Sequence, residues 1–124
     1  MKFYRCKHCG NIIVYMHDSG VPVVCCGEKP EELTPGAVEA ATEKHIPVIS
    51  ADGKLINVKV GSVEHPSLPE HYIMFIVLET DKGFMTKNLN PGDKPCADFM
   101  LTEGETAVRA YEYCNLHGLW AANV

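Results

Sequence analysis

The chain has 124 residues, of which 46% are hydrophobic and 22% charged, and its formal net charge is −5. This length allows one ordinary domain, or one domain with a very small companion. The acidic balance argues against a nucleic-acid surface and against attraction to anionic membranes. No apolar run approaches the roughly 20 residues that span a bilayer. Because "MKFYRCKHCG" reaches two cysteines before any signal-peptide core could form, we expect a cytoplasmic protein.

Cysteines are concentrated at the beginning of the chain. Four of the six lie in residues 1–36, and they are Cys6, Cys9, Cys25 and Cys26. In a reducing compartment such pairs indicate metal or redox chemistry, and a disulfide-stapled secreted module is the alternative. Between the pairs, "NIIVYMHDSGVPVV" predicts two short strands around a turn at residues 18–20. The following "GEKPEELTPG" predicts a linker. So small a segment needs a metal or disulfide for stability.

The spacing of these cysteines predicts a four-thiolate metal site. "CKHCG" is a Cys-x-x-Cys turn that lets two thiolates converge on one ion. Cys25 and Cys26 are adjacent, so the backbone must bend to bring both sulfurs to the same ion, and Gly27 permits that bend. We therefore expect a distorted tetrahedron, which suits zinc or iron. Spacing alone favours structural zinc, and a strained disulfide between Cys25 and Cys26 is a further alternative.

The rest of the chain has the pattern of an antiparallel β-sandwich. Seven strands are predicted, in "HIPVIS", "KLINVKV", "HYIMFIVLET", "FMTKNL", "ADFML", "TAVRAYEYC" and "GLWAANV". Turns are expected at residues 51–53 and 81–83, and "PGAVEAATEKH" has room for one or two helical turns. In the second strand, Ile56, Val58 and Val60 alternate with polar residues, which is typical of a half-buried strand.

A second group of potential metal ligands lies between these strands. It comprises His45, His65, His71, Cys114 and His117. Each alone has an ordinary interpretation, as a surface histidine or a buried thiol. Five donors are one more than the four ligands of structural zinc, and four histidines are two more than a blue-copper site uses. Iron accepts six ligands, so five protein donors leave one position open. With ferrous iron and one thiolate the site is cationic and favours a small anion. We expect His8 and His17 to be surface residues.

Two charged residues precede the first of these histidines. Lys44 would attract an anion toward the open position. Glu43 would bind the oxidised metal or position a water that donates a proton. The alternative for both is an ordinary exposed pair. The thiolate of Cys114 would donate electron density through the iron, as axial cysteine does in some haem enzymes.

Five segments of the chain resemble the desulfoferrodoxin family of two-iron superoxide reductases. They are "CKHCG", "VCCGE", "EKHIPV", "HP…EHYI" and "CNLHG", in family order between Tyr4 and Trp120. The resemblance implies a mainly β fold. A small, metal-stapled, desulforedoxin-like module occupies residues 1–36 and holds an iron centre with four cysteine ligands. A seven-stranded, immunoglobulin-like antiparallel β-sandwich, the neelaredoxin-like superoxide reductase domain, occupies residues 37–124.

The resemblance also implies ligands, partners and a reaction. The first iron takes Cys6, Cys9, Cys25 and Cys26. The second takes His45, His65, His71 and His117 around it and Cys114 axially, with Glu43 and Lys44 beside the open position. By this resemblance, superoxide would be reduced to hydrogen peroxide in a homodimer by electrons from rubredoxin or a similar carrier. A non-catalytic two-iron electron carrier and a zinc-bearing structural protein remain the alternatives. Cys96 belongs to neither pattern.

Overall fold

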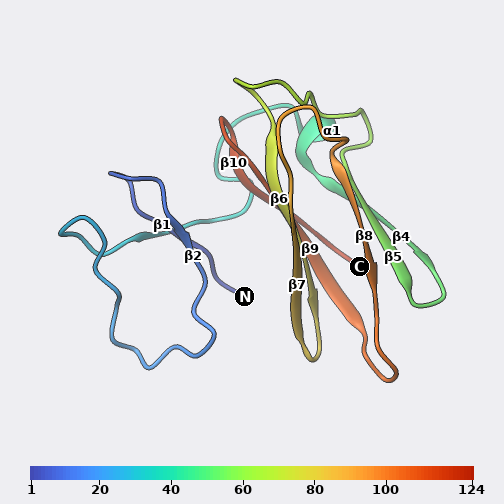
Figure 1. Cartoon of the computed structure of the whole chain (residues 1–124), viewed down its shortest axis with the longest axis horizontal. Coiled ribbons are helices and arrows are strands. Elements are labelled where there is room, and N and C mark those ends of the chain that lie inside the picture. Colours follow the sequence, from blue (N-terminus) through green and yellow to red (C-terminus); the bar gives the residue numbers. More distant parts are fainter. The chain divides into compact units, whose positions relative to one another are not determined.

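The structure, a computed structural model, describes residues 1–124 and divides into two compact units (Figure 1). The first unit runs from Met1 to Thr34 and the second from Pro35 to Val124. No helix of the structure is long and apolar enough to cross a bilayer.

The first unit is built on a small antiparallel sheet of three two-residue strands. In the order β2-β1-β3, these are β2 (Ile12–Ile13), β1 (Tyr4–Arg5) and β3 (Glu31–Glu32). The linker predicted for residues 27–36 is therefore wrong at residues 31–32, which form β3 and pair with the free edge of β1.

The strand predicted after the turn at residues 18–20 is also absent. The turn itself is present, because the Gly20 N–H donates to Asp18 Oδ1 over 2.8 Å. Beyond it, however, Val21 and Val24 are exposed, and the Val23 N–H donates to the hydroxyl of Tyr15 rather than to a neighbouring strand. Without a core to cover, the apolar residues of this segment do not enforce a β-ladder.

The second unit is a β-sandwich of seven strands with one short helix, α1 (Thr42–His45). The strands are β4 (Pro47–Asp52), β5 (Leu55–Val60), β6 (Ile73–Thr80), β7 (Gly83–Asn88), β8 (Cys96–Met100), β9 (Ala107–Cys114) and β10 (Gly118–Asn123). They form two antiparallel sheets, β10-β9-β6-β7 and β4-β5-β8. The prediction of a mainly β, seven-stranded immunoglobulin-like sandwich is confirmed. The first hairpin turns at residues 53–54, slightly later than expected, because Ala51 and Asp52 still pair with β5.

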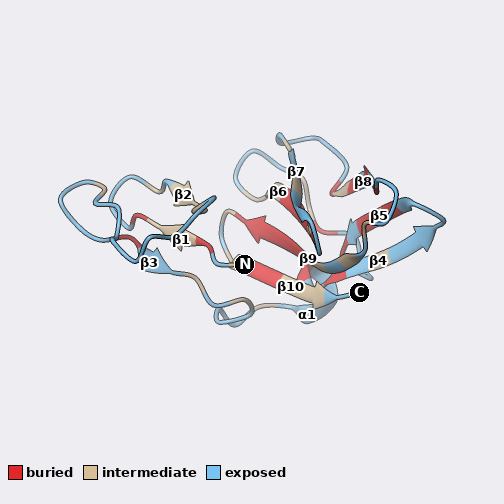
Figure 2. Ribbon diagram, turned by 90° about the horizontal axis from the view of Figure 1, so that it is seen from below, coloured by how far each residue is buried: buried red, intermediate tan, exposed pale blue.

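The core of the sandwich lies between the two sheets. Ile56, Val58 and Val60 are almost completely buried and alternate along β5, as their period predicted. Ile76 and Leu78 face them from β6, which is buried along most of its length (Figure 2). Cys114, at the end of β9, belongs to the same core cluster. The packed sheets therefore hold the ends of β5, β6 and β9, and the segments that contain His65, His71 and His117 begin or end there.

Candidate metal centres

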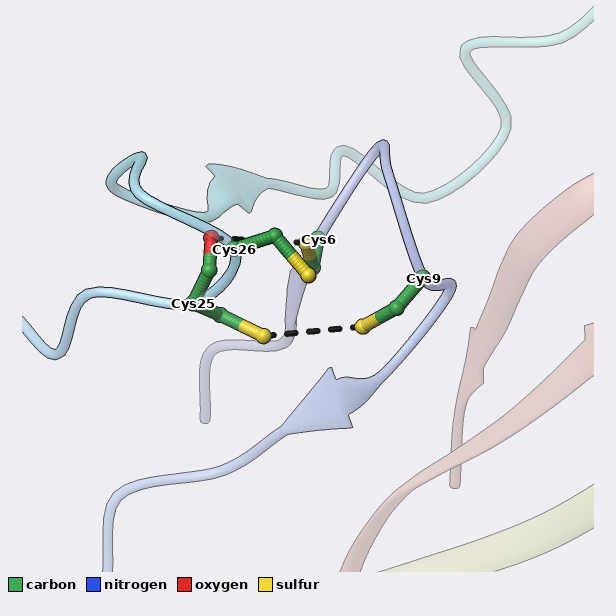
Figure 3. A group of neighbouring side chains, drawn as sticks. All are labelled: Cys6, Cys9, Cys25 and Cys26. Atoms are coloured by element: carbon green, nitrogen blue, oxygen red, sulfur yellow. Dashed lines mark hydrogen bonds between the residues drawn. The ribbon is translucent and has the colours of Figure 1, made fainter.

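The four N-terminal cysteines form one compact group of sulfurs, which we call the cysteine centre (Figure 3). Their sulfur atoms all lie within 4.8 Å of one another. The sulfurs of Cys9 and Cys25 are 3.5 Å apart, and the Cys6 sulfur lies 3.6 Å from the carbonyl oxygen of Cys25. Backbone φ is +51° at Cys26 and +77° at Gly27. This left-handed pair supplies the bend that lets two adjacent cysteines face the same point.

The thiols of the cysteine centre influence each other's ionisation. A hydrogen bond from the backbone N–H of Cys9 lowers the pKa of Cys6 to about 6. Proximity to the sulfurs of Cys9 and Cys6 raises the pKa of Cys26 to about 12. Four thiolates this close repel one another unless a cation lies among them. The donor set therefore fits a thiophilic ion such as iron or zinc.

A surface carboxylate links the two halves of the cysteine centre. Glu28 follows the second cysteine pair, and its carboxylate lies 3.4 Å from Lys7 Nζ and 3.3 Å from His8 Nε2 in the first turn. The hydrogen bond with His8 and the charge of Lys7 lower the pKa of Glu28. His8 is thus a surface residue, as predicted, and has a partner outside the ligand set.

The five donors of the second unit also meet, and we call them the histidine centre. His45 ends α1, and His65 and His71 lie in the segment between β5 and β6. Cys114 ends β9, and His117 lies in the turn to β10. The donor atoms of His45, His65, His71 and Cys114 all lie within 4.8 Å of one another. His117 Nδ1 lies 3.2 Å from His45 Nε2 and 3.8 Å from Cys114 Sγ.

The four imidazoles form a closed cycle. Ring centroids are separated by 4.8 Å from His45 to His65, and by 4.6 Å from His65 to His71. The cycle continues with 5.1 Å from His71 to His117 and 4.9 Å from His117 back to His45. Neighbouring ring planes meet at 77° to 88°. Because Cys114 is fully buried, its thiol approaches from the core, whereas His71 and His117 are partly exposed.

Backbone carbonyls orient two of these rings. His45 Nδ1 lies 2.7 Å from the carbonyl oxygen of Ala41, and His65 Nδ1 lies 2.7 Å from that of Pro66. Each Nδ1 therefore carries the proton and donates it, which leaves Nε2 as a lone-pair donor facing the cluster. The Nε2 atoms of His65 and His71 are buried without any hydrogen-bond partner. Buried polar atoms are rarely unpaired, so these two fit a bound cation.

Burial favours the neutral forms of His45, His65, His71 and Cys114 in the histidine centre. Burial lowers the pKa of His45 and His71, and it lowers that of His65 to about 4. Burial raises the pKa of the Cys114 thiol. Hydrogen bonds from the backbone N–H groups of Leu116 and His117 partly offset this increase. Neutral imidazoles are the form that binds metal. A cation would in turn favour the thiolate over the thiol.

Comparisons with known proteins agree with this arrangement. The model of the desulfoferrodoxin N-terminal domain matches residues 1–33, and the desulfoferrodoxin model matches residues 37–123. The chain belongs to the desulfoferrodoxin family. A desulfoferrodoxin from Syntrophotalea carbinolica is 45% identical over 122 residues, which cover 98% of this chain and 95% of that protein.

Two further relatives are named for an activity. The crystal structure of the superoxide reductase from Treponema pallidum has a TM-score of 0.82 and 40% identity, and covers 98% of this chain and 97% of that one. A superoxide reductase from Thermococcus kodakarensis is 34% identical over 99 residues, or 66% of this chain and 86% of that protein. Each desulfoferrodoxin segment of the present chain carries one of the two centres.

Glu43 and Lys44 lie on α1 immediately before His45, the first histidine of the histidine centre. Both side chains are exposed, and the group of clustered donor atoms contains no carboxylate. The positive charge of Lys44 contributes to the lowered pKa values of His45 and His71, so it acts on the histidine centre. Cys96, half-buried at the start of β8, is part of neither donor group.

Two supporting residues escaped the sequence analysis. Asn115 Oδ1 accepts a hydrogen bond from the Tyr72 N–H over 2.9 Å, and its Nδ2 donates to the carbonyl oxygen of Glu70 over 3.0 Å. This amide joins the segments that flank His71 and Cys114. Trp120 stacks on the ring of His45, and its Nε1–H donates to the carbonyl oxygen of His117 over 3.1 Å. Both residues lie in "CNLHGLW", but turn asparagines and strand tryptophans have commoner roles that spacing cannot exclude.

Proposed function

We propose that this protein is a superoxide reductase, which converts superoxide, one electron and two protons into hydrogen peroxide. The observation that carries the proposal is the histidine centre: four imidazoles in a closed cycle with one buried thiol. The relatives named superoxide reductase support it.

Two non-haem iron ions per chain form part of the proposal. The ligands of the first would be Cys6, Cys9, Cys25 and Cys26, and those of the second His45, His65, His71, Cys114 and His117. The unpaired Nε2 atoms of His65 and His71 and the clustered thiols support a bound metal at each centre. At the histidine centre, ferrous iron would supply the transferred electron and an open coordination position. A redox-active ion is required because zinc cannot change its oxidation state.

The side chains at the histidine centre would attract the substrate, deliver protons and keep the imidazoles available to the metal. Lys44 places a positive charge beside the cluster and draws in the superoxide anion, which the acidic chain as a whole repels. Glu43, exposed on the same helical turn, would position a water that delivers protons, or would itself contact the oxidised metal. The lowered pKa values of His45, His65 and His71 prevent protons from competing with the metal for these nitrogens.

The first unit would serve electron transfer. We assign residues 1–36 to a desulforedoxin-like domain, whose closed four-sulfur centre exchanges electrons but has no position for substrate. We assign residues 37–124 to the superoxide reductase domain. The two compact units and the two family segments support this division.

The reaction consumes an external electron in every turnover, so it needs a donor. We propose rubredoxin or a similar small carrier as the donor, a homodimer as the assembly, and the cytoplasm as the location. The six free cysteines support a reducing compartment. Exposed apolar side chains on the first unit, Met16, Val21 and Val24, support self-association.

Pulse radiolysis with the iron-loaded protein tests the activity. We expect one hydrogen peroxide for each superoxide consumed, no dioxygen produced, and one electron withdrawn from a reductant. Half a dioxygen per superoxide would indicate dismutation instead. Iron analysis and a visible spectrum recorded with and without azide complete the test. A coloured protein that neither consumes superoxide nor responds to azide would be an electron carrier, and a colourless zinc protein would contradict the iron assignment.

A further inference from the structure

Gly61, directly after β5, is distinguished from the other glycines of the chain. Nine of the ten glycines have a positive φ, between +60° and +149°, which accounts for glycine at those turns. Gly61 lies outside this conformation, is buried, and faces the backbone of α1. A Cβ at this position would lie 2.6 Å from the carbonyl oxygen of Glu43 and 3.1 Å from that of Ile46. It would also lie 3.1 Å from the carbonyl carbon of Lys44.

The three atoms that an added Cβ at Gly61 would approach all belong to the backbone. A flexible side chain could rotate away from an added methyl group, but these atoms can move only if the turn itself moves. No other glycine of the chain has such a contact, since the nearest atom to any other added Cβ is 3.5 Å away. The identity of Gly61 is therefore explained by the close approach of α1.

The residues after Gly61 hold the same helical turn. The Val63 N–H donates to the carbonyl oxygen of Glu43 over 2.9 Å, and the Ser62 hydroxyl donates to the same oxygen over 3.2 Å. The His65 N–H in turn donates to the carbonyl oxygen of Val60 over 2.9 Å. Residues 61–63 thus form a seat for α1 and are continuous with the ligand His65. We call these residues the glycine seat.

The helical turn depends on such a support. α1 has only four residues, and the side chain at its N-cap, Ala41, makes no capping hydrogen bond. A helix this short is not stable by itself. Glu43 and Lys44 extend from it into solvent, so their positions follow the backbone of α1. The ligand His45 is its last residue.

We propose that Gly61 is a positioning residue of the superoxide reductase site: its bare Cα lets α1 approach closely, and this fixes Lys44 and His45 relative to the other donors of the histidine centre. The inference rests on the proposed function of Lys44 and His45. Gly61 touches neither substrate nor metal in this proposal, and acts through the turn that it seats.

The substitution Gly61→Ala in the iron-loaded full chain tests the proposal. The added methyl group displaces α1, so we expect iron to leave the histidine centre for EDTA about tenfold faster, as when other supports of metal ligands are lost. We also expect about a tenfold slower second-order reaction with superoxide and a weaker dependence of this rate on ionic strength, because Lys44 is displaced. The spectrum of the cysteine centre should not change.

Gly53→Ala is the matched control. Gly53 lies in the β4–β5 hairpin with φ of +60° and open space around its Cα, so alanine strains the fold there without touching α1. We expect its iron release and superoxide rate to stay within twofold of the wild type. The proposal is overturned if Gly61→Ala behaves as the wild type does, or if both alanine variants change alike.

A milder variant covers the case in which Gly61→Ala does not fold. Ser62→Ala removes one of the two donors to the Glu43 carbonyl, and we expect iron release about threefold faster than in the exposed-strand control Ser50→Ala. Equal rates in these two variants would overturn the proposal. A wild-type protein that binds iron but does not consume superoxide would instead refute the proposed function, and the EDTA measurement would still test the glycine seat.

Discussion

The indole of Trp120 lies against the imidazole of His45, with ring centroids 5.0 Å apart and ring planes 29° from parallel. The same indole donates a hydrogen bond to the carbonyl oxygen of His117. One buried side chain on β10 thus supports two members of the histidine centre that are far apart in sequence. His45 comes from α1 before the first strand of the sandwich, and His117 from its last turn.

Substitutions of Trp120 should weaken metal binding at the histidine centre, and the loss should be larger when more of its contacts are removed. Trp120→Phe keeps an aromatic ring for the stack but loses the hydrogen bond to His117, so we expect about a threefold loss of iron affinity at the histidine centre. Trp120→Leu loses both contacts, and we expect a loss of 10- to 100-fold. Competition with a chelator measures the affinity, and the spectrum of the cysteine centre is the internal control. Equal iron affinity in the wild type and Trp120→Leu would show that the stack does not support the site.

Much of this architecture was predictable because its signals are local. Alternation of apolar residues identified β5, the apolar run identified β6, and the spacing of cysteines and histidines identified the donors. The small first unit was harder to predict. Strand β3 consists of exposed residues, Glu31 and Glu32, and forms through pairing with β1 rather than through an apolar pattern.

The supports of the histidine centre could not be predicted for a related reason. Asn115 and Trp120 act through contacts with residues 43 to 75 positions away, and Gly61 acts through the backbone of another element. A single sequence records none of these pairings. Ligand identity follows from residue type and spacing, whereas ligand orientation follows from tertiary packing.

Acid should destabilise the sandwich when no metal is bound. The pKa of His65 is about 4 in the folded protein, below the roughly 6.5 of an unfolded histidine. Between these values the unfolded chain binds more protons, so the free energy of unfolding falls as the pH drops from 6.5 to 4. Protonation of His65 in the unfolded chain alone lowers the free energy of unfolding by about 3 kcal/mol at pH 4. Well above pH 6.5 this loss disappears, because His65 is neutral in both states.

Urea unfolding of the metal-free protein at several pH values measures this effect. Fluorescence of Trp120, the single tryptophan of the chain, reports on the sandwich. His65→Gln cannot take up the proton, so its free energy of unfolding should fall less steeply between pH 6.5 and 4. If wild type and variant lose stability in parallel, the ring of His65 is not held neutral by burial.

Lys44 should determine how fast superoxide arrives. Its charge acts on His45 and His71, so Lys44→Ile removes attraction at the point where the anion must bind. We expect roughly a tenfold slower second-order rate at low ionic strength and a weaker salt dependence. Lys82→Ile, in the β6–β7 turn, makes the same change of net charge away from the histidine centre and should leave the rate nearly unchanged. An unaltered rate in Lys44→Ile, or equal losses in both variants, would remove the steering role.

Cys114 should control the colour and reactivity of the histidine centre. Cys114→Ser replaces the thiol with a harder oxygen donor of nearly the same size, in a position that is fully buried. We expect the sulfur-to-iron charge-transfer band and the reductase activity to disappear. Cys96→Ser, which changes a half-buried thiol outside both centres, should leave both properties intact. Full activity in Cys114→Ser would refute the assignment of this thiol as a ligand.

The cysteine centre should be separable from superoxide chemistry. Cys9 is exposed, and its sulfur lies 3.5 Å from that of Cys25, so Cys9→Ser removes one ligand without opening the core of the sandwich. We expect the loss of one iron per chain and of the four-sulfur spectrum, with a second-order rate toward superoxide within about twofold of the wild type. Re-reduction by the electron donor should be slower if the cysteine centre relays electrons, and equal if reduction reaches the histidine centre directly. Loss of the superoxide reaction itself, with the histidine centre still loaded, would contradict the division of labour between the two units.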